Sequence, residues 1–595
     1  MGTLHLIRSP PKMVSTNRHG EELTINFYDK LSQERKEQQA RGLLPEWYST
    51  GGYQLFKQKY MWASTPREQY EAIAATAAQH TDDAPRWKDK FLELLWNGWL
   101  SPSTPVLANM GTTRGFPVSC SGSYTPDSIH GFYSALHEMA LLTKGGFGTS
   151  TYLGDVRPRG SRISTGGKSS GVIPVLRARV QASRDVSQGG VRRGADASYL
   201  PLDHGDFDEV VTLLENEPDD LNIGWTISDA VRDAIISDTR DESTLPMKLR
   251  FARTLKAKTT TGKGYYWKTD SANRKLPVYY PISNKSAGLC NEILLPSDDS
   301  HTYSCILSSM NLAKWDEWKD TDAVFNATVF LDCVASEFIK QAKGVPGLEK
   351  VVRFTEKARA LGLGTCGLHT YLQEHMIPFE SMEAMMFNDE AFSHIWQEAN
   401  RASEWMGEAW GVPEWIHNYR AEDGKSVVRR NASLIAIAPT KSTALIMGGV
   451  SEGINPDVGF TYTQATSAGE INRVSPVILN IMKDRGVYDN KHIKEITNAF
   501  GSVQGVDWLS DDEKKVFKTA FEINQYTVLR LASQRAKYID QWQSLNLFFA
   551  GDAPSSYIAG VHKEALADDN ILGLYYLYSM SGVAGSDPDD CEACQ

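Results

Sequence analysis

The sequence has no long apolar run and no recognisable leader. No stretch approaches the roughly 18 apolar residues that a membrane-spanning helix needs. Residues 1–8 contain no apolar segment long enough for a signal peptide, and Leu6 breaks the pattern for N-terminal myristoylation. We therefore expect a cytoplasmic protein that has no membrane as a partner.

Cysteine is scarce as well, with seven in 595 residues. This density is far below that of a disulfide-stapled secreted protein, so cysteines placed in pairs favour a catalytic or metal-binding role. Cys591 and Cys594 form a lone C-x-x-C pair, which is a poor zinc site because zinc requires four ligands. We expect no metal in this chain.

Overall positive charge is lacking, since the net charge is −11. Such a balance argues against binding a nucleic acid polymer, whose phosphates demand a basic face. Eight arginines nevertheless fall between Arg157 and Arg193. Guanidinium groups match phosphate oxygens bidentately, so this stretch indicates a small phosphorylated ligand, although a merely solvated basic face remains the alternative.

Apolar periodicity divides the chain into a helical start and a mixed remainder. Residues 66–99 predict two amphipathic helices within an N-terminal helical region of about 100 residues. After residue 105, short apolar runs broken by glycines alternate with helices, which indicates an α/β fold. Further predicted helices cover residues 128–144, 391–410 and 511–536, and predicted strands cover residues 434–439 and 443–447.

Glycine-rich segments give weaker signals. Residues 166–169 read Gly-Gly-Lys-Ser, but a phosphate-binding P-loop needs glycine at position 162, which is arginine here. Residues 144–148 and 188–194 form two glycine-rich loops at predicted helix ends, where bare backbone N–H groups could approach a phosphate closely. Ordinary turns have the same composition.

Cys290 and Glu292 are two residues apart in Gly-Leu-Cys-Asn-Glu-Ile. If this segment is extended, both side chains point to the same face. A thiol with a positioned carboxylate can supply a radical or nucleophilic centre together with a general base. The alternative for an isolated C-x-E is a small buried cysteine beside a rim charge.

A set of motifs in one order resembles the large catalytic subunit of ribonucleotide reductase over about residues 45–595. The motifs are Ser103-Thr104-Pro105, Ser119-Cys120, Gln188 to Arg192, Leu289 to Ile293, Cys305 to Asn311, Pro439 to Thr443 with Gly453 to Pro456, and Leu574-Tyr575-Tyr576. The resemblance implies a ten-stranded α/β barrel over residues 101–578 with a central finger loop. It also implies a small N-terminal helical domain over residues 1–100 and a redox-active tail over residues 579–595.

In that family, ribonucleotides, here expected to be diphosphates, are reduced to 2′-deoxyribonucleotides by thiyl-radical chemistry. The resemblance implies that Cys290 carries the thiyl and that Glu292 takes the 3′-OH proton. Cys120 and Cys305 match the pair that supplies the reducing equivalents and closes to a disulfide. Cys333 and Cys366 match none of these positions, and we expect them to be structural.

Substrate contacts follow from the same resemblance. The matching residues are Thr104, Ser119, Gly146, Gly288, Pro439, Thr440, Lys441, Ser442 and Thr443. One of them departs from the family pattern, because Gly288 stands where the family usually has an asparagine that hydrogen-bonds the ribose. Asn291, Ser286, Asn284 or a water molecule could take over that contact, and the sequence leaves the choice open.

Tyr575 and Tyr576 match a tyrosine pair that relays an electron and a proton between Cys290 and a separate radical-generating β subunit with its own metallocofactor. Two core aromatic residues on a helix are the ordinary alternative. Cys591 and Cys594 lie in a Gly/Ser/Asp/Pro-rich tail, and we expect them to exchange with thioredoxin or glutaredoxin. An adenosylcobalamin-dependent reductase and a catalytically silent nucleotide-binding regulator are the rival functions.

The resemblance also implies allosteric control by dNTP or ATP effectors and a homodimer. The matching effector residues are Asp127, Ser128, Arg157, Gln188 and Arg192. The family's N-terminal ATP-binding cone is not expected, because the residues before Ser103 match the family's own helical domain. No cofactor is expected to be bound permanently in this chain.

Overall fold

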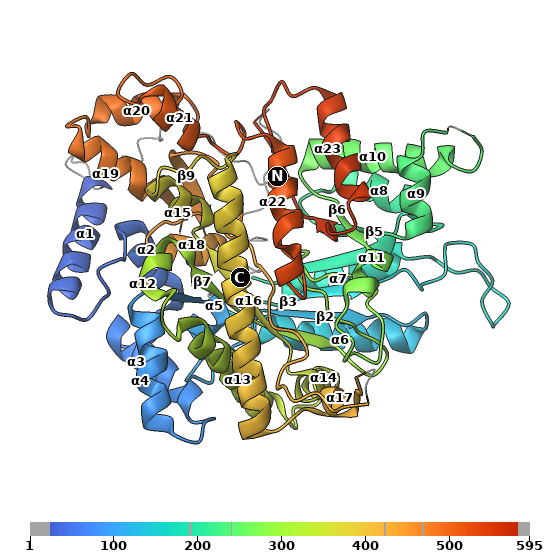
Figure 1. Ribbon diagram of the computed structural model, residues 1–595. Coiled ribbons are helices and arrows are strands. Elements are labelled where there is room, and N and C mark those ends of the chain that lie inside the picture. Colours follow the sequence, from blue (N-terminus) through green and yellow to red (C-terminus); the bar gives the residue numbers. More distant parts are fainter. Residues whose placement is uncertain (1–23, 190–192, 240, 422–423, 467–468, 581–595) are drawn as a thin grey trace, which may run out of the picture.

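The structure is a computed structural model that describes residues 24–580, apart from residues 190–192, 240, 422–423 and 467–468 (Figure 1). The predicted sites at Arg192, Cys591 and Cys594 therefore lie outside the described residues. No helix in the described part is both long and apolar enough to cross a membrane.

The N-terminal region is helical, as the sequence predicts. It comprises α1 (Thr24–Ala40), α2 (Thr50–Leu55), the π-helix η1 (Phe56–Tyr60), α3 (Pro66–Ala78) and α4 (Ala84–Trp96). The side chains of Thr65 and Asp83 cap α3 and α4, each accepting a hydrogen bond from a backbone N–H of the first turn, and a proline lies in that turn of each helix. These caps fix where the two predicted amphipathic helices begin.

A curled sheet forms the centre of the molecule. Its strands are β1 (Leu100–Pro102), β2 (Cys120–Tyr124), β3 (Gly148–Tyr152), β4 (Asp196–Pro201), β5 (Ile223–Ile227), β6 (Tyr265–Lys268), β7 (Tyr303–Asn311), β8 (Leu361–Cys366) and β12 (Gly573–Leu574). Strands β2 to β6 are parallel to one another, as are β7 and β8. The two sets meet in antiparallel pairs, β2 with β7 on one side and β6 with β12 on the other.

Single bridges continue the second set between β8 and β12. Ile435 bridges to Leu363 of β8, and Ile437 bridges to Gln543. The N–H of Tyr575 donates to the carbonyl of Leu545 at 2.9 Å, which leads on to β12. The sheet therefore curls back on itself, and the predicted strand at 434–439 is present only as two single bridges. The count of ten strands stays a prediction.

Helices surround this sheet (Figure 1). Helix α5 (Thr104–Asn109) follows β1. Those that follow strands of the first set are α6 (Ile129–Lys144), α7 (Ile173–Asp185), α8 (Phe207–Asn216), α9 (Asp229–Ile236), α10 (Leu245–Thr261) and α11 (Thr269–Lys275). The next are η2 (Leu312–Lys314), α12 (Trp315–Trp318), α13 (Ala323–Ala342), α14 (Glu349–Ala358), α15 (Leu368–Glu374), α16 (Met382–Trp410) and α17 (Glu414–Asn418). Alternation of strand and helix thus surrounds the curled sheet with a helical shell.

The chain after residue 440 forms a hairpin, a small satellite core and the final helices. Its elements are α18 (Lys441–Ile446), β9 (Thr461–Thr466), β10 (Gly469–Val474), α19 (Pro476–Asp484), α20 (Asn490–Asn498), α21 (Asp511–Val516), α22 (Gln525–Arg535), η3 (Ala536–Tyr538), β11 (Leu547–Phe549), α23 (Ser555–Ala567) and β13 (Leu577–Ser579). Buried side chains from Phe460 to Phe517 make a hydrophobic cluster separate from the main core.

Three sequence predictions about elements need correction here. Residues 443–446 are helical in α18, because Ala444 and Leu445 favour a helix once Thr440 has turned the chain in a left-handed conformation (φ 53°), and Met447 caps the end of that helix. Residues 511–536 are two helices, α21 and α22, since Asn524 caps a new helix start. The predicted tail begins later than residue 579, because Ser579 still belongs to β13.

Candidate active site

Cys120 and Cys305 face each other across two paired strands. They are direct Cα partners in the antiparallel pairing of β2 with β7, and both are buried thiols. Directly opposed residues in such a pair have Cα atoms about 4.5–5.5 Å apart, inside the range that a disulfide spans. The strand register therefore places these two cysteines where a disulfide can form without backbone movement.

Cys290 lies on a turn inside the curled sheet. The N–H of Asn291 donates to the carbonyl of Gly288 at 3.1 Å, and Asn291 has a positive φ of 68°. The segment is thus not extended, so the simple same-face argument for Cys290 and Glu292 does not apply. Cys290 is buried at this turn.

Hydrogen bonds from two sides hold this turn. The hydroxyl of Tyr199 on β4 donates to the carbonyl of Gly288 at 2.7 Å, and the hydroxyl of Ser544 donates to the carbonyl of Cys290 at 2.7 Å. The N–H of Trp542 donates to the carbonyl of Glu292 at 2.9 Å. The turn is therefore fixed from both halves of the sheet, as expected for a finger loop in a barrel.

Glu292 is fully buried beside the cysteine pair. Burial raises its pKa to about 8, opposed by hydrogen bonds that include one from Ser544. Burial also raises the pKa of Cys305 well above its usual value, and the nearby Cys120 and Glu292 raise it further. Groups that shift one another's pKa must lie near one another, so the carboxyl and the two thiols share one desolvated pocket.

Gly288 has no room for the asparagine that the family pattern contains. A Cβ atom at this position would lie 2.9 Å from Cγ1 of Ile293 and 3.2 Å from Sγ of Cys120. Both distances are tighter than ordinary van der Waals contact. Close packing against Ile293 and Cys120 therefore explains why position 288 is glycine here and not the family's asparagine.

Of the residues considered for the missing ribose contact, Asn284 is already committed. Its Oδ1 accepts from Nε1 of Trp267, and its Nδ2 donates to the carbonyls of Ser286 and Leu295. Asn291 donates to the hydroxyl of Tyr199, and its buried Oδ1 has no hydrogen-bond partner among the described residues. Asn291 is thus the better placed of the two amides to accept a further hydrogen bond.

Tyr575 and Tyr576 lie in a segment between β12 and β13 that is not helical. Their ring centroids are 4.1 Å apart, and Tyr265 on β6 packs against both, at 4.8 Å and 5.4 Å. The hydroxyls of Tyr265 and Tyr576 are 3.2 Å apart. The structure therefore contains a buried cluster of three tyrosines where the sequence indicated two.

The remaining residues of the predicted substrate site lie at loop and helix starts. Thr104 begins α5, Ser119 directly precedes β2, and the left-handed Thr440 precedes α18 and accepts at Oγ1 from the N–H of Gly453 at 2.8 Å. Lys441 lies close enough to the partly exposed Glu452 to oppose the rise that partial burial causes in the pKa of that carboxyl.

Gly146 and Gln188 come together, although the sequence assigned them to different sites. Gly146 has a φ of 101°, and a Cβ atom there would lie 2.6 Å from Oε1 of Gln188. Nε2 of Gln188 donates to Oδ1 of Asn109 at 2.6 Å. The loop predicted to carry the effector signal is therefore anchored on the glycine loop of the predicted substrate site.

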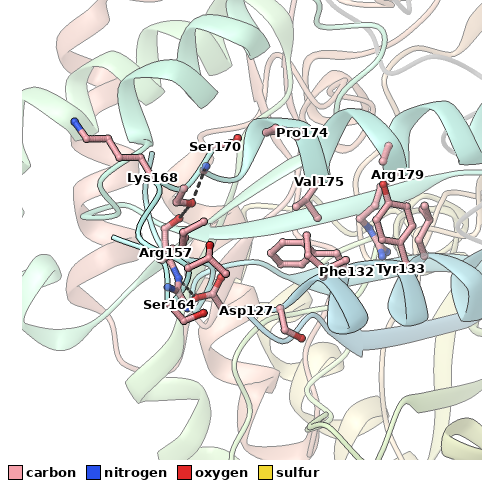
Figure 2. A pocket seen from close by; sticks show the side chains of 18 residues that line it. Asp127, Phe132, Tyr133, Arg157, Ser164, Lys168, Ser170, Pro174, Val175 and Arg179 are labelled. Carbon is pink, nitrogen blue, oxygen red and sulfur yellow. Dashed lines mark hydrogen bonds and ion pairs between the residues drawn. The ribbon is translucent and has the colours of Figure 1, made fainter. Parts of the chain in front are cut away.

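A cavity of about 550 Å³ lies between α6 and α7 (Figure 2). Asp127, Arg157 and Lys168 line this cavity. Nε of Arg157 and Oδ2 of Asp127 form an ion pair at 2.5 Å. Phe132 and Val175 give the other part of the cavity an apolar wall. Asp127, Ser128 and Arg157 thus share one cavity, whereas Gln188 is not among its lining residues.

No group of three or more potential metal ligands occurs within the described ranges. Cys333 on α13 and Cys366 at the end of β8 are buried, and burial raises the pKa of each thiol. Such thiols are poorly reactive.

Comparison with known proteins resolves the family. The ribonucleotide reductase barrel domain matches residues 118–247, 240–429 and 418–576, and the ribonucleotide reductase all-alpha domain matches residues 46–115. The chain belongs to the ribonucleotide reductase large-subunit family. The predicted family and the barrel with its helical N-terminal domain are thereby confirmed.

Individual ribonucleotide reductases are similar along most of their length. A putative ribonucleoside-diphosphate reductase large subunit of Frog virus 3 (isolate Goorha) is 31% identical over 549 residues, covering 87% of this chain and 94% of that protein. The solved Actinobacillus ureae class Id ribonucleotide reductase alpha subunit superposes with a TM-score of 0.80 at 33% identity, covering 92% of this chain and 99% of that one.

A relative from another reductase class is similar too. A vitamin B12-dependent ribonucleoside-diphosphate reductase of Mycobacterium tuberculosis (strain CDC 1551 / Oshkosh) is 30% identical over 493 residues, covering 79% of this chain and 69% of that protein. Family membership by itself therefore leaves the source of the radical open.

Several residues around this reductase site gave no signal in the sequence. Tyr199 donates to the carbonyl of Gly288 in the turn that carries Cys290. Nε2 of Gln541 lies 3.7 Å from Sγ of Cys305. Tyr265 completes the tyrosine cluster from β6. None of them belongs to one of the motifs, so only the tertiary contacts reveal their place.

Proposed function

We propose that this chain is the catalytic subunit of a ribonucleoside-diphosphate reductase, which replaces the 2′-OH of a ribonucleotide with hydrogen. The observation that carries the proposal is the pairing of Cys120 with Cys305 beside the buried Glu292, under a turn that presents Cys290. A dithiol, a carboxyl and a third cysteine in one desolvated pocket suit a radical reduction that must exclude water.

The proposed chemistry begins at Cys290. Its thiyl radical takes the hydrogen atom from C3′, while Glu292 accepts the 3′-OH proton. The 2′-OH then leaves as water with a proton from the cysteine pair. Cys120 and Cys305 together supply two electrons and two hydrogens, one as the proton that leaves with the water and one to C2′, and become a disulfide. Glu292 returns its proton to the 3′ oxygen, and Cys290 returns the hydrogen atom to C3′ and becomes a thiyl radical again.

We assign substrate phosphate binding to Thr104, Ser119, Gly146 and the segment from Pro439 to Thr443. Hydroxyls, backbone N–H groups and the Lys441 ammonium are suitable donors for phosphate oxygens. The proximity of Gly146 to Gln188 supports communication between this site and the effector loop. Asn291 is our candidate for the ribose contact, because its buried Oδ1 has no hydrogen-bond partner among the described residues.

For the radical source we propose a separate β subunit that carries a metallocofactor. The tyrosine cluster supports this assignment, because stacked tyrosines can pass an electron and a proton between the subunit surface and Cys290. The second candidate is an adenosylcobalamin-dependent enzyme, which the similarity to the B12-dependent relative favours. Cys591 and Cys594 are proposed to shuttle electrons from thioredoxin or glutaredoxin to the internal pair.

We further propose that dNTPs or ATP bind in the cavity between α6 and α7, with phosphates toward Arg157 and Lys168. Its volume of about 550 Å³ admits a nucleotide, and its apolar wall suits a base. Ser128 caps α6 at this cavity. A homodimer through the exposed side chains Ile129 and Tyr133 of α6 would close the open side.

One assay tests these assignments. Deoxynucleotide formation is measured for each ribonucleotide and each effector, with β subunit or with adenosylcobalamin, and for Cys290→Ser under the same conditions. We expect turnover only with β subunit. Cys290→Ser should show essentially none, because an O–H bond is too strong for the radical exchange, although this variant should still bind nucleotide. Turnover by Cys290→Ser would reject the thiyl assignment, and turnover with cobalamin alone would favour the second candidate.

A further inference from the structure

A buried lysine that the proposed chemistry does not use lies beside the tyrosine cluster. Lys258 is in the last turn of α10, and its side chain is 0% exposed. Its Nζ donates to the carbonyl of Gly264 at 2.9 Å and to the carbonyl of Tyr575. One residue therefore ties the start of β6 to the segment that carries the tyrosine pair.

This position is costly for an ammonium group. Burial alone lowers the pKa of Lys258 to about 7, and no carboxylate within the described ranges contributes to offset it. Burying an ammonium without a counter-ion carries a desolvation cost, which the two carbonyl hydrogen bonds of Lys258 only partly offset. The neighbours of Lys258 therefore matter for its role in the site.

Two of these neighbours are tyrosine rings. Nζ lies 5.9 Å from the ring centroid of Tyr265 and 5.4 Å from that of Tyr266, within cation–π range. Tyr265 in turn packs against Tyr575 and Tyr576 and places its hydroxyl 3.2 Å from that of Tyr576. Lys258 thus contacts the backbone of one tyrosine of the pair and the ring that touches both.

We propose that Lys258 is a positioning residue of the tyrosine relay, whose Nζ clamps the carbonyl of Tyr575 by a hydrogen bond and holds the pair against Tyr265. This inference rests on the proposed relay role of Tyr575 and Tyr576. Transfer between neighbouring rings depends on their spacing and hydrogen bonding, and misplacement by about 1 Å can cost on the order of a hundredfold in rate. A clamp on the backbone fixes that spacing without itself accepting an electron.

The test uses the full chain with its β subunit and compares Lys258→Met with the unsubstituted protein. Methionine has a similar length but cannot donate to the two carbonyls. We expect kcat to fall by roughly tenfold or more, with KM for the ribonucleotide and nucleotide affinity unchanged. Decay of the β-subunit radical signal after mixing with substrate should slow in parallel, and Lys258→Arg, which keeps donors, should recover part of the rate.

Lys268→Met is the matched control. Lys268 is also buried and lies on β6, the strand that carries Tyr265. Its Nζ donates to the carbonyls of Ala565, Leu566 and Asp568 at the end of α23. We expect this variant to leave the decay of the radical signal unchanged. Equal losses of turnover and Tm in the two methionine variants would instead give Lys258 a purely structural role and overturn the inference.

Tyr575→Phe separates this inference from the relay itself. If Tyr575→Phe retains full turnover, the relay role of the pair is wrong. If Tyr575→Phe abolishes turnover while Lys258→Met turns over like the unsubstituted protein, the relay stands and the clamp is rejected. Loss of turnover in both, with normal nucleotide binding and partial rescue by arginine, supports the clamp.

Discussion

At the scale of single residues, burial sets the chemistry of this site. Glu292 has no exposed surface, and loss of hydration raises its pKa to about 8. The same burial keeps the Cys305 thiol protonated by raising its pKa. A carboxyl that exchanges its proton near neutral pH beside protonated thiols is suited to accept the 3′-OH proton and to leave hydrogens on the pair.

We expect the pH dependence of single-turnover reduction to follow Glu292. Its base form becomes more abundant as pH rises through about 8, so the rate should increase between about pH 6 and about pH 9. Glu292→Gln should lose most of the rate and this increase. The measurement is deoxynucleotide formed by pre-reduced protein across that range, and a flat profile would argue against Glu292 as the base.

The stability of the protein should change in the opposite sense. The pKa of Glu292 is higher in the folded chain than its ordinary value of about 4.5, so the folded state binds the proton more tightly. Its contribution to folding is therefore least unfavourable below about pH 4.5 and becomes fully unfavourable above about pH 8. Glu292→Gln should remove this loss, which unfolding curves at several pH values would detect.

Gly288 shows how one missing side chain is tied to the pocket. Gly288→Ala would place a methyl group against Ile293 and the sulfur of Cys120. We expect destabilisation by roughly 1–3 kcal/mol, since a well-packed interior must shift to admit it. Gly505→Ala is the control, because a Cβ atom there meets nothing within 4 Å. Denaturant unfolding compares the two variants. Equal free energies of unfolding would show that the segment around Gly288 adjusts to the methyl group without loss of stability.

At the scale of elements, the register of paired strands brings distant cysteines together. Cys120 and Cys305 are 185 positions apart in the printed sequence, and the antiparallel contact of β2 with β7 makes them direct partners. The two parallel sets of strands meet at this contact and again at β6 and β12, next to the tyrosine cluster. The cysteine pair and the tyrosine cluster thus lie at the two places where the parallel sets of the curled sheet meet.

This register predicts a specific disulfide. After one round of reduction without external reductant, Cys120 and Cys305 should be joined, while Cys333 and Cys366 should remain thiols because they are buried in other elements. Peptide mapping after thiol alkylation measures this. The Cys120→Ser variant serves as the control and should give no such linkage. Any other pairing of Cys305 in the unsubstituted protein would contradict the assignment.

At the scale of the whole molecule, the reaction needs electrons to reach a pocket that the sheet encloses. Cys120 is 3% exposed and Cys305 0% exposed, so a protein reductant cannot reach them directly. The tail that contains Cys591 and Cys594 lies outside the described residues, and its role rests on composition and the family resemblance.

We expect the double variant Cys591→Ser/Cys594→Ser to complete one round of reduction and then stop when thioredoxin is the reductant. The reason is that the tethered tail dithiol can reduce the internal disulfide, whereas thioredoxin can reduce only the tail pair. A small dithiol that can enter the pocket should partly restore multiple turnover. Product formed per subunit over time is the measurement, and undiminished thioredoxin-driven turnover would show that another route exists.

The sequence by itself determined the family, the helical start followed by an α/β barrel, and the cysteines and glutamate to examine, since short motifs and apolar periodicity are local. It misjudged residues 443–447, where a left-handed Thr440 starts a helix, and it could not see the turn at Cys290. These depend on packing against distant segments.

Only the tertiary structure decided which residues meet. Strand pairing set Cys120 opposite Cys305, packing left no space at Gly288, and Tyr265 and Lys258 joined the tyrosine pair from β6 and α10. Each of these contacts joins segments that are far apart along the chain. The physical reason is that register and burial are properties of paired elements, and a linear order of residues specifies neither until the sheet has closed.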